Sequence, residues 1–495
     1  MDLSFFLNPG YVMAALGTLI LFGALCNKVS SRFNLPILLI FLIVGLVLGE
    51  TIVSQSKDFT FVNYLGTVAM AFILFSGGLD TSFKSVRKVL VPGGVLATLG
   101  VVVTALILAL GIYFVLLFIS PEYKTLFGHC FLIASIISST DAATVFALLR
   151  GKGVGVKGKL QPLIELESGS NDPMAYFLTL FALDLVLNKA SFDLETVLLL
   201  FYRMGAGVAM GIGMGLFGKL LYKIKLDYEG LYFVFKISIV LLSYGLTDLI
   251  QGNGMMACYV CGITMAHLGF NYQKGMTRFS DGISWLMQVI LFTTLGLCVE
   301  LKVIAVVWKY GLLFALILMF IARPLAIFIC TVFTSLSFKE KTFVSWVGLR
   351  GAAPIVLATF PLAAKIEKGD LMFALVFIMV VSSMLIQGMT LMPVARLLGV
   401  AKEVTGSIRM PLELEVTHES NGREMKEFII SKNSELIEKS LAEAGFPKDT
   451  LVTMIRRNNQ FISPRGDTKL EENDALQIIA SCEAMKILEK DFFEV

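Results

Sequence analysis

The chain contains the sequence Leu166-Glu167-Ser168-Gly169-Ser170-Asn171-Asp172-Pro173, inside a hydrophobic segment that continues through Ala175-Tyr176-Phe177-Leu178. Two carboxylates therefore stand in a run of residues that is apolar enough to cross a membrane. An ionisable side chain at membrane depth is costly unless it faces a wet cavity or a partner, so such residues usually mark the path of an ion or a proton. This stretch is the first candidate for the functional site.

Helical spacing places the polar side chains of this stretch on two neighbouring faces. Ser168 and Asp172 are four residues apart and share one face, whereas Glu167 and Asn171 share the adjacent face. One hydroxyl and one carboxylate can therefore converge on a cation. The alternative is a helix N-terminus at the membrane edge, where acidic side chains only complement the helix dipole.

The composition indicates a polytopic membrane protein. Of the 495 residues, 56% are hydrophobic and 16% are charged, and the mean hydropathy is +0.79. A soluble domain has roughly one half apolar and one quarter charged residues. A span needs about 20 mainly apolar residues, and this template predicts thirteen spans, centred near Leu19, Phe41, Ala69, Ala105, Ala134, Leu178, Ala209, Val240, Thr264, Ile290, Leu316, Ile355 and Val380.

The charges of the loops predict the orientation of the chain in the membrane. Alternate loops are rich in Lys and Arg, as in residues 84–88, 150–159 and 219–225, and the intervening loops are poor in them. The positive-inside rule then places the N-terminus outside and the C-terminus in the cytoplasm. An odd number of spans agrees with this orientation. The net charge of only +3 argues for no nucleic-acid partner.

Two spans contain residues that interrupt a helix. The fifth span contains Ser138-Ser139-Thr140-Asp141, whose side chains compete for backbone hydrogen bonds. A later span contains Gly348-Leu349-Arg350-Gly351-Ala352-Ala353-Pro354, which is rich in poor helix formers. Paired interruptions in the two halves of a chain indicate a transporter built from inverted repeats, with the ion site between them. The alternative for the first is a Ser/Thr-rich packing face, which Asp141 disfavours.

Further charged side chains lie in or beside the spans. Arg323 and Arg350 both stand in apolar segments, and an arginine left unpaired at low dielectric is prohibitively costly. Glu167 is therefore their natural partner. Asp80 ends an apolar run beside a basic loop, and it is either an interfacial residue paired with Lys84 or a member of the ion path.

The chain divides at about residue 400 into a membrane domain, 1–400, and a small cytoplasmic domain, 401–495, because charged residues become frequent and no later stretch could span a bilayer. The pattern predicts a small α+β domain, which would gain stability by dimerising. Strands are predicted at Leu412–Thr417, Lys426–Ser431, Leu451–Arg456 and Ala475–Ile479, helices near Ser434–Ala444 and Glu483–Lys490, and a hairpin turn at Asn458-Asn459.

These motifs resemble a known family. Residues 10 to 398, through Thr140-Asp141, the Glu167 to Pro173 stretch, Arg323 and Gly348-Leu349-Arg350-Gly351-Ala352, are similar to the NhaP-like branch of the monovalent cation/proton antiporters. The tail resembles the TrkA-C (RCK C-terminal) ligand-binding domain, through Leu451-Val452, Ile455-Arg456-Arg457 and Ile462-Ser463-Pro464-Arg465-Gly466-Asp467-Thr468. The combination is similar to bacterial potassium/proton antiporters.

The resemblance implies an all-α homodimer in the bacterial inner membrane. Each subunit would have thirteen spans with inverted repeats and two broken crossing helices, and a core domain would move like an elevator against a dimerisation domain. Dimer contacts would involve both the membrane spans and the tail. The tail would bind a regulatory ligand such as a nucleotide or a cyclic dinucleotide, although its basic residues could equally form a solvated face.

The resemblance also implies roles for individual residues. Asp172 would bind the cation and the proton in competition. Ser168 and the Thr140 backbone would help to coordinate the ion, and Asn171 would stabilise the crossing of the broken helices. The same match places Asp141 in the ion site and pairs Glu167 with Arg323 in preference to Arg350. Asp80 takes approximately the place of a family carboxylate on the third span. The Asn171-Asp172 pair resembles the electroneutral branch.

The expected activity is exchange of a monovalent cation, K⁺ in preference to Na⁺, for H⁺. A membrane receptor that senses ions or nucleotides without net transport is the alternative. A potassium channel would need a carbonyl filter such as T-V-G-Y-G, which the sequence lacks. An enzyme is not expected, because the histidines His129, His267 and His418 lie far apart and no nucleophile stands beside a base.

Overall fold

The structure is a computed structural model, and it describes residues 10, 13–14, 17–18, 20–25, 37–52, 59–81, 86–119, 127–150, 154–187, 194–224, 226–228, 230–269, 273–403, 423–430, 434, 436–457, 460–488 and 492. The strand predicted at Leu412–Thr417 and the turn predicted at Asn458-Asn459 lie outside these residues. The same holds for Lys84 and for the centre of the first predicted span at Leu19.

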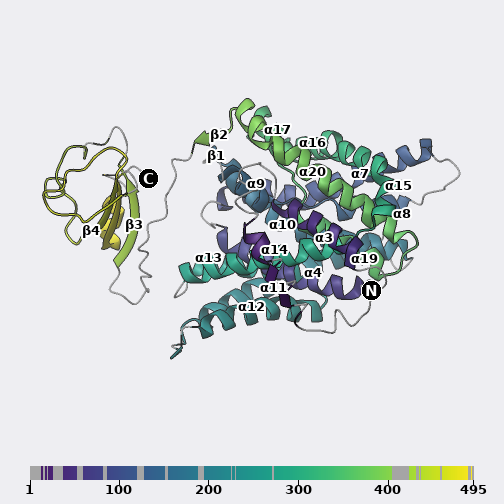
Figure 1. The fold of residues 1–495 in the computed structure, drawn as a ribbon, viewed down its shortest axis with the longest axis horizontal. Helices are drawn as coiled ribbons and strands as arrows, with labels where there is room; N and C mark the ends of the chain where they lie inside the picture. The colour runs from purple at the N-terminus through teal and green to yellow at the C-terminus, as the bar shows by residue number, and fades with distance from the viewer. Residues whose placement is uncertain are drawn as a thin grey trace. The chain divides into compact units, whose positions relative to one another are not determined.

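The first part of the chain is a bundle of apolar helices (Figure 1). Among the described residues, seven helices are long and apolar enough to cross a membrane: Thr60–Asp80, Arg87–Phe118, Phe201–Leu221, Leu231–Leu249, Gly275–Cys298, Leu301–Cys330 and Gly369–Leu397. Shorter apolar helices cover Ile37–Gly49, Phe127–Ile136, Gly254–Leu268 and Ala352–Ala363. The expectation of a mostly helical membrane fold is therefore confirmed.

The elements of this bundle follow one another in this order: α3 (Ile37–Ile52), α4 (Phe59–Asp80), η1 (Arg87–Val89), α6 (Leu90–Val95), η2 (Leu96–Gly100), α7 (Val101–Ile119), α8 (Phe127–Ile136), α9 (Ala142–Arg150), β1 (Val154–Val156), α10 (Leu160–Val186), α11 (Leu194–Leu221), α12 (Leu231–Leu249), α13 (Gly254–Leu268), α14 (Gln273–Cys298), α15 (Leu301–Ile317), η3 (Leu318–Ala322), α16 (Arg323–Cys330), α17 (Phe338–Trp346), α18 (Ala352–Leu357), α19 (Thr359–Ala363), α20 (Gly369–Leu397) and β2 (Ala401–Glu403).

Two of the long helices contain a π-helical turn. The turn η2 joins α6 to α7, and the turn η3 joins α15 to α16 and ends directly before Arg323. Such turns insert one extra residue per turn and occur often at functional sites, because they re-aim the side chains that follow.

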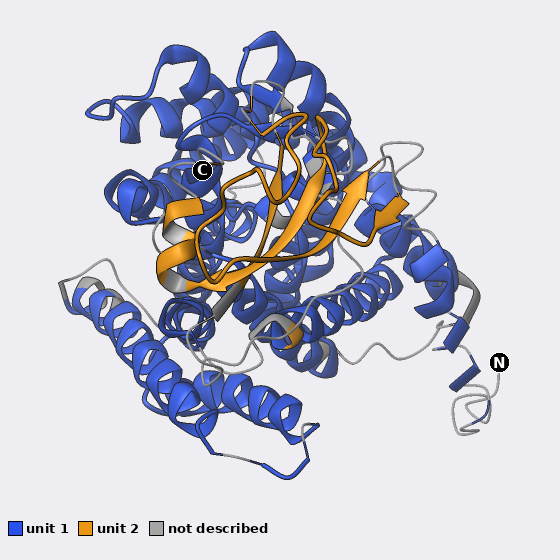
Figure 2. Ribbon diagram, turned by 90° about the vertical axis from the view of Figure 1, so that its left-hand side faces the viewer, with its two compact units in different colours: residues 1–269, 276–407 blue, residues 270–275, 408–495 orange. Residues whose placement is uncertain are grey.

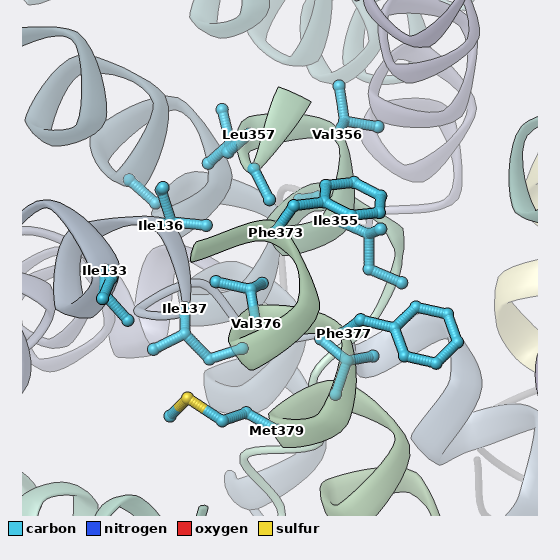
Figure 3. Close-up of a cluster of buried hydrophobic side chains, with 14 of the residues drawn as sticks. Ile133, Ile136, Ile137, Ile355, Val356, Leu357, Phe373, Val376, Phe377 and Met379 are labelled. Carbon is cyan, nitrogen blue, oxygen red and sulfur yellow. The ribbon is translucent and has the colours of Figure 1, made fainter. Parts of the chain in front are cut away.

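Both predicted helix interruptions are present. The first helix stops at Ile136 and resumes at Ala142, and the second stops at Trp346 and resumes at Ala352. The residues between are unwound in each case. Hydrophobic side chains pack around the interrupted helices: those of α8 and α18 meet those of α20 in a buried cluster that includes Ile133, Ile136, Ile355, Leu357, Phe373 and Val376 (Figure 3).

Glycines bring several helix backbones into direct contact. A Cβ on Gly78 of α4 would lie 2.3 Å from the carbonyl oxygen of Tyr259 in α13, and a Cβ on Gly262 would lie 2.3 Å from that of Phe75. The glycine-rich helix α11 approaches α13 in the same way through Gly207, Gly211 and Gly215. The helices α4, α11 and α13 are thus joined at backbone distance, which is typical of small-residue packing in membranes.

Two adjacent glycines of α4 provide a matched test of this packing. We expect Gly78→Ala to lower the thermal unfolding midpoint in detergent, because its methyl group would meet backbone, and overpacking typically costs about 1–3 kcal/mol. Gly77→Ala is the control, since nothing lies within 4 Å of its Cβ position. Equal unfolding midpoints for the two variants would contradict the close approach of α4 and α13.

The C-terminal unit is a small β-sheet domain (Figure 2). The two compact units comprise residues 1–269 with 276–407 and residues 270–275 with 408–495. The sheet has the order β3-β6-β4-β5 with antiparallel pairs, and its strands are β3 (Arg423–Ile429), β4 (Leu451–Arg457), β5 (Gln460–Ile462) and β6 (Ala475–Ser481). A helix, α21 (Cys482–Ile487), follows. The strands predicted at Lys426–Ser431, Leu451–Arg456 and Ala475–Ile479 are confirmed.

The prediction of a helix at Ser434–Ala444 is wrong. The described residues of this segment form turns instead. Glu438 adopts a left-handed conformation with φ 68°, which ends a right-handed helix. The backbone N–H groups of Glu438 and Leu441 donate to the carbonyls of Leu470 and Thr468, rather than within a helix. The amphipathic pattern therefore arises because one side of the turns covers the sheet.

Two basic residues of the tail, Arg456 and Arg457, form ion pairs within the domain. Arg457 donates to Asp474 at 2.8 Å and also pairs with Glu471, and Arg456 lies 3.8 Å from Glu427. These two arginines therefore serve the internal structure of the domain.

Candidate ion-binding site

The two unwound segments meet each other in the bundle. The backbone N–H of Asp141 donates to the carbonyl of Leu349 at 2.8 Å. The guanidinium of Arg350, which is 1% exposed, donates to the carbonyls of Ser138 and Ser139 at 2.7 and 2.6 Å. These carbonyls follow the C-terminal end of α8, where a positive charge is stabilising. Arg350 therefore satisfies the backbone groups that the interruption leaves without helical partners.

The helix α10 is fastened to the first interruption by Ser168 and Asn171. The Ser168 hydroxyl donates to the Thr140 carbonyl at 2.8 Å and accepts from the backbone N–H of Ala142 at 2.7 Å. The Asn171 amide donates to Thr140 Oγ1 at 2.6 Å and accepts from the Thr140 N–H at 3.3 Å. The Thr140 carbonyl, which was expected to help coordinate the ion, thus accepts a hydrogen bond from Ser168 in this structure.

Asp141 caps the resumed helix α9. Its two carboxylate oxygens accept hydrogen bonds from the backbone N–H and the hydroxyl of Thr144, at 3.1 and 2.6 Å, as an N-cap residue does. A Cβ on Gly351 would lie 2.3 Å from Asp141 Oδ2. The glycine in the second interruption therefore leaves room for the carboxylate of the first.

Glu167 and Arg323 form a buried ion pair. Arg323 Nη2 lies 2.8 Å from Glu167 Oε1, and the two residues are 1% and 2% exposed. Asn171 donates a further hydrogen bond to the same carboxylate oxygen at 3.2 Å. The structure thus brings Glu167 to Arg323, whereas the hydrogen bonds of the Arg350 guanidinium go to backbone carbonyls.

Asp172 faces a cavity of about 50 Å³ between these elements. The polar wall of the cavity comes from Ser139, Thr140, Asp141 and Asp172, and residues 351–354 of the second interruption complete it. Asp172 is partly accessible to the cavity and forms no ion pair with any residue that the structure describes. Ser139 Oγ, in the wall of this cavity, is buried and has no hydrogen-bond partner among the described residues. Such a cavity can hold a cation or water beside a carboxylate.

Asp80 is not part of this arrangement. It is the last residue of α4, it is exposed, and it does not line the cavity. The structure therefore brings together Thr140, Asp141, Ser168, Asn171 and Asp172, with Glu167, Arg323 and Arg350 behind them, but it leaves Asp80 apart.

Sequence reasoning missed three polar residues around the site. Gln288 of α14 lines the cavity, as do apolar residues of α3 and α4. Ser383 accepts from the backbone N–H of Arg350 at 3.2 Å and donates to Gln387 at 2.6 Å, and Gln387 donates to the carbonyl of Trp346 at 3.0 Å. Isolated amides in apolar spans were the available signal, since a polar side chain in a span usually has a specific partner.

Comparison with known proteins identifies the family. Residues 17–397 match the family model described as the sodium/hydrogen exchanger, transmembrane. The chain belongs to this family. Residues 425–492 of this family member match the TrkA-C domain, so the exchanger domain is followed by a TrkA-C domain.

Curated relatives and solved structures agree with the family. The "K(+)/H(+) antiporter NhaP2" of Shewanella sp. (strain ANA-3) is 34% identical over 99% of this chain and 83% of its own length. The "K(+)/H(+) antiporter NhaP" of Alkalimonas amylolytica is 32% identical over 94% of this chain and 80% of its own. The sodium proton antiporter MjNhaP1 of Methanocaldococcus jannaschii has a similar fold, with a TM-score of 0.66 at 23% identity, over 78% of this chain and 98% of that one.

The buried ion pair of this exchanger predicts a strong dependence of stability on Glu167. We expect Glu167→Gln to lower the free energy of unfolding by about 3–5 kcal/mol, because removal of one partner leaves the Arg323 charge buried and uncompensated. The measurement is the thermal unfolding midpoint together with the yield of purified protein. Glu195→Gln is the control, because Glu195 is an exposed residue in the first turn of α11. Similar midpoints for both variants would contradict the structural role of the pair.

Proposed function

We propose that the protein exchanges a monovalent cation for a proton across the membrane, with Asp172 as the carrier. The observation that carries this proposal is the contrast between Glu167 and Asp172, two of the carboxylates of α10. Glu167 is buried in an ion pair, whereas Asp172 faces a cavity and has no ion-pair partner among the described residues. A carboxylate in that position can hold either a cation or a proton, because the first positive charge removes its attraction for the second.

The charges around the cavity support exchange of one cation for one proton. Three carboxylates (Glu167, Asp141 and Asp172) stand with the guanidiniums of Arg323 and Arg350. When all are ionised, the group carries one net negative charge. One proton or one K⁺ neutralises this charge. Movement of the group across a low-dielectric barrier costs less free energy when its net charge is zero. The electroneutral exchange implied by Asn171-Asp172 follows from this balance.

K⁺ is the favoured cation, with Na⁺ as the second candidate. The support is the relatives named K(+)/H(+) antiporters, at about one third identity over nearly the whole chain. Ser168 and Thr140 are proposed as ion ligands at one stage of the cycle. Their hydrogen bond would have to open for both oxygens to face the ion, which gives these residues a gating role as well. Asp141 contributes negative charge from its position as the cap of α9.

The order of elements supports two repeats in the membrane unit. A helix with a π-helical turn (α6-η2-α7) precedes an interrupted helix (α8-α9) and the long helix α10. The same order recurs as α15-η3-α16, then α17-α18, then α20. We propose that these two sets are the inverted repeats of a thirteen-span subunit in the bacterial inner membrane, with the N-terminus outside and the C-terminus in the cytoplasm. They would form the core that moves against a dimerisation domain in a homodimer.

The tail is proposed to regulate exchange by binding a ligand such as a nucleotide or cyclic dinucleotide. The support is a direct link within the membrane unit. The strand β2, which leads toward the tail, pairs antiparallel with β1, which directly precedes α10. In addition, Lys157 Nζ donates to the Gly399 carbonyl at 3.0 Å. A displacement of β2 would therefore be transmitted through β1 to α10.

The role of Asp172 has a matched test on the same helix. We expect Asp172→Asn to abolish cation-dependent proton flux in proteoliposomes while leaving the unfolding midpoint close to that of the wild type, because an amide carries no charge to exchange. Asp184→Asn, further along α10 and outside the cavity, should retain flux. Appreciable exchange in Asp172→Asn would show that another group is the carrier.

Regulation by the tail predicts an effect of truncation. We expect a chain that ends at residue 407, which keeps β2, to exchange ions with a shifted dependence on pH or added ligand. A chain that ends at residue 400 also loses β2 and should show an additional change in the maximal rate, because β1 then lacks its partner. An unchanged pH profile in the longer truncation product would reduce the tail to an assembly element.

A further inference from the structure

A second cavity lies beside the carrier helix. It has a volume of about 180 Å³ and shares no lining residue with the cavity of Asp172. It reaches the protein surface at Asp248 and Gln251, which are exposed, and it ends inside the protein at Asn253, which is 3% exposed. Its lining comprises Tyr176, Phe177 and Leu180 of α10, Arg203 of α11, Asp248, Gln251, Gly252 and Asn253. We call it the Tyr176 vestibule.

The inner end of the Tyr176 vestibule is closed by Asn253. Its side-chain amide donates to the carbonyl of Pro173 at 2.8 Å, and Pro173 directly follows Asp172. The same side chain caps α13, because its oxygen accepts from the backbone N–H of Met256 at 3.0 Å. The backbone N–H of Asn253 donates to the Arg203 carbonyl at 2.9 Å. One buried asparagine thus links α13 and α11 to the backbone beside the carrier.

A tyrosine closes the same boundary one turn further along α10. Tyr176 lies four residues after Asp172 and therefore on the same helix face. Its hydroxyl lies 3.5 Å from that of Tyr244 in α12, and its ring packs edge-on against Phe360 at 5.7 Å between centroids. The contact between the hydroxyls of Tyr176 and Tyr244 is at the long limit of a hydrogen bond. Two side-chain contacts beside the vestibule therefore join α10 to α12 and α13.

These contacts differ in kind from those that hold α13 to its other neighbours. The helices α4 and α11 approach α13 at backbone distance through glycines, so they form one closely packed body. The contact of α10 with α13 at Gly169 is instead made by the ring of Tyr259, and the hydrogen bond of Asn253 is a single side-chain link. Movement of α10 relative to α13 would break the hydrogen bond of Asn253 and would slide Gly169 along the ring of Tyr259.

We propose that Asn253 gates a second access route to Asp172, through which a hydrated monovalent cation or a proton enters from the Tyr176 vestibule. The inference rests on the proposed exchange function. In the present conformation Asp172 faces its own cavity, and the hydrogen bond of Asn253 to the Pro173 carbonyl holds α10 in place. Release of this bond lets α10 shift and opens the vestibule toward the carrier. The charged side chains of its lining are the carboxylate of Asp248, at the exposed mouth, and the guanidinium of Arg203.

The decisive variant is Asn253→Ser. Serine is an equally good N-cap, so α13 keeps its cap, but its hydroxyl is too short to reach the Pro173 carbonyl. Cation-driven proton flux is measured in right-side-out and everted vesicles, which gives an apparent KM for K⁺ from each side. Loss of a hydrogen bond that favours one conformation should change the ratio of the two KM values roughly fivefold. The KM should fall on the vestibule side and rise on the other, because the fraction of carrier facing each side changes in opposite directions.

Three further variants separate gating from folding. Tyr176→Phe removes the hydroxyl contact to Tyr244 but keeps the ring, and it should change the KM ratio in the same direction as Asn253→Ser. Asn253→Ala also removes the cap of α13. It should lower the unfolding midpoint and change the KM ratio in the same direction as Asn253→Ser. Tyr202→Phe is the control, because it deletes a hydrogen bond of 2.9 Å to the carbonyl of Ile250 that does not involve α10, and its ratio should match the wild type.

The outcomes distinguish this inference from the function on which it rests. A wild-type KM ratio in Asn253→Ser, with exchange intact, would overturn the gating role of Asn253 while leaving the antiport function standing. A uniform loss of rate from both sides would overturn it as well, because that is the signature of a structural role. Absence of cation-dependent proton flux in the wild-type protein would instead refute the proposed function itself.

Discussion

The ion pair between Glu167 and Arg323 is the interaction on which the rest of the site depends. Two adjacent turns of α10 place two carboxylates in the membrane, and both cannot remain ionised there without compensation. Arg323, which directly follows a π-helical turn, forms an ion pair with Glu167 at 2.8 Å. Asp172 lines the cavity and has no ion-pair partner among the described residues. The paired carboxylate and the carboxylate at the cavity are separated by only five positions along a single helix.

The two unwound segments expose backbone groups near these carboxylates. Their freed carbonyls and N–H groups are satisfied by side chains: Arg350 binds two carbonyls, Asp141 caps α9, and Ser168 and Asn171 fasten α10 to Thr140. Buried polar networks of this kind are stable only when nearly every member is paired. These hydrogen bonds fix the walls of the cavity beside Asp172, where Ser139 Oγ is left without a hydrogen-bond partner among the residues that the structure describes.

Much of this site could be predicted from the sequence, because a charged residue in an apolar run has few permissible environments. The spacing within Leu166 to Pro173 placed the polar faces, and helix-breaking residues located both interruptions. The partners of Arg350 could not be predicted, since a guanidinium can satisfy carbonyls as well as a carboxylate. Gln288 was missed because its role depends on which helix faces the cavity. The helix expected at Ser434–Ala444 failed because covering one side of a sheet produces the same amphipathic pattern as a surface helix.

If a single site exchanges one K⁺ for one H⁺, the stoichiometry of transport is one to one and can be measured. Proteoliposomes containing the wild-type protein can be prepared with a fixed K⁺ gradient, and the pH gradient at which net proton flux stops can then be measured at several imposed membrane potentials. For exchange of one K⁺ for one H⁺, we expect the proton flux to stop when the K⁺ and H⁺ concentration ratios are equal, whatever the potential. A stopping point that moves with the potential would show unequal exchange and would contradict a single carrier charge at Asp172.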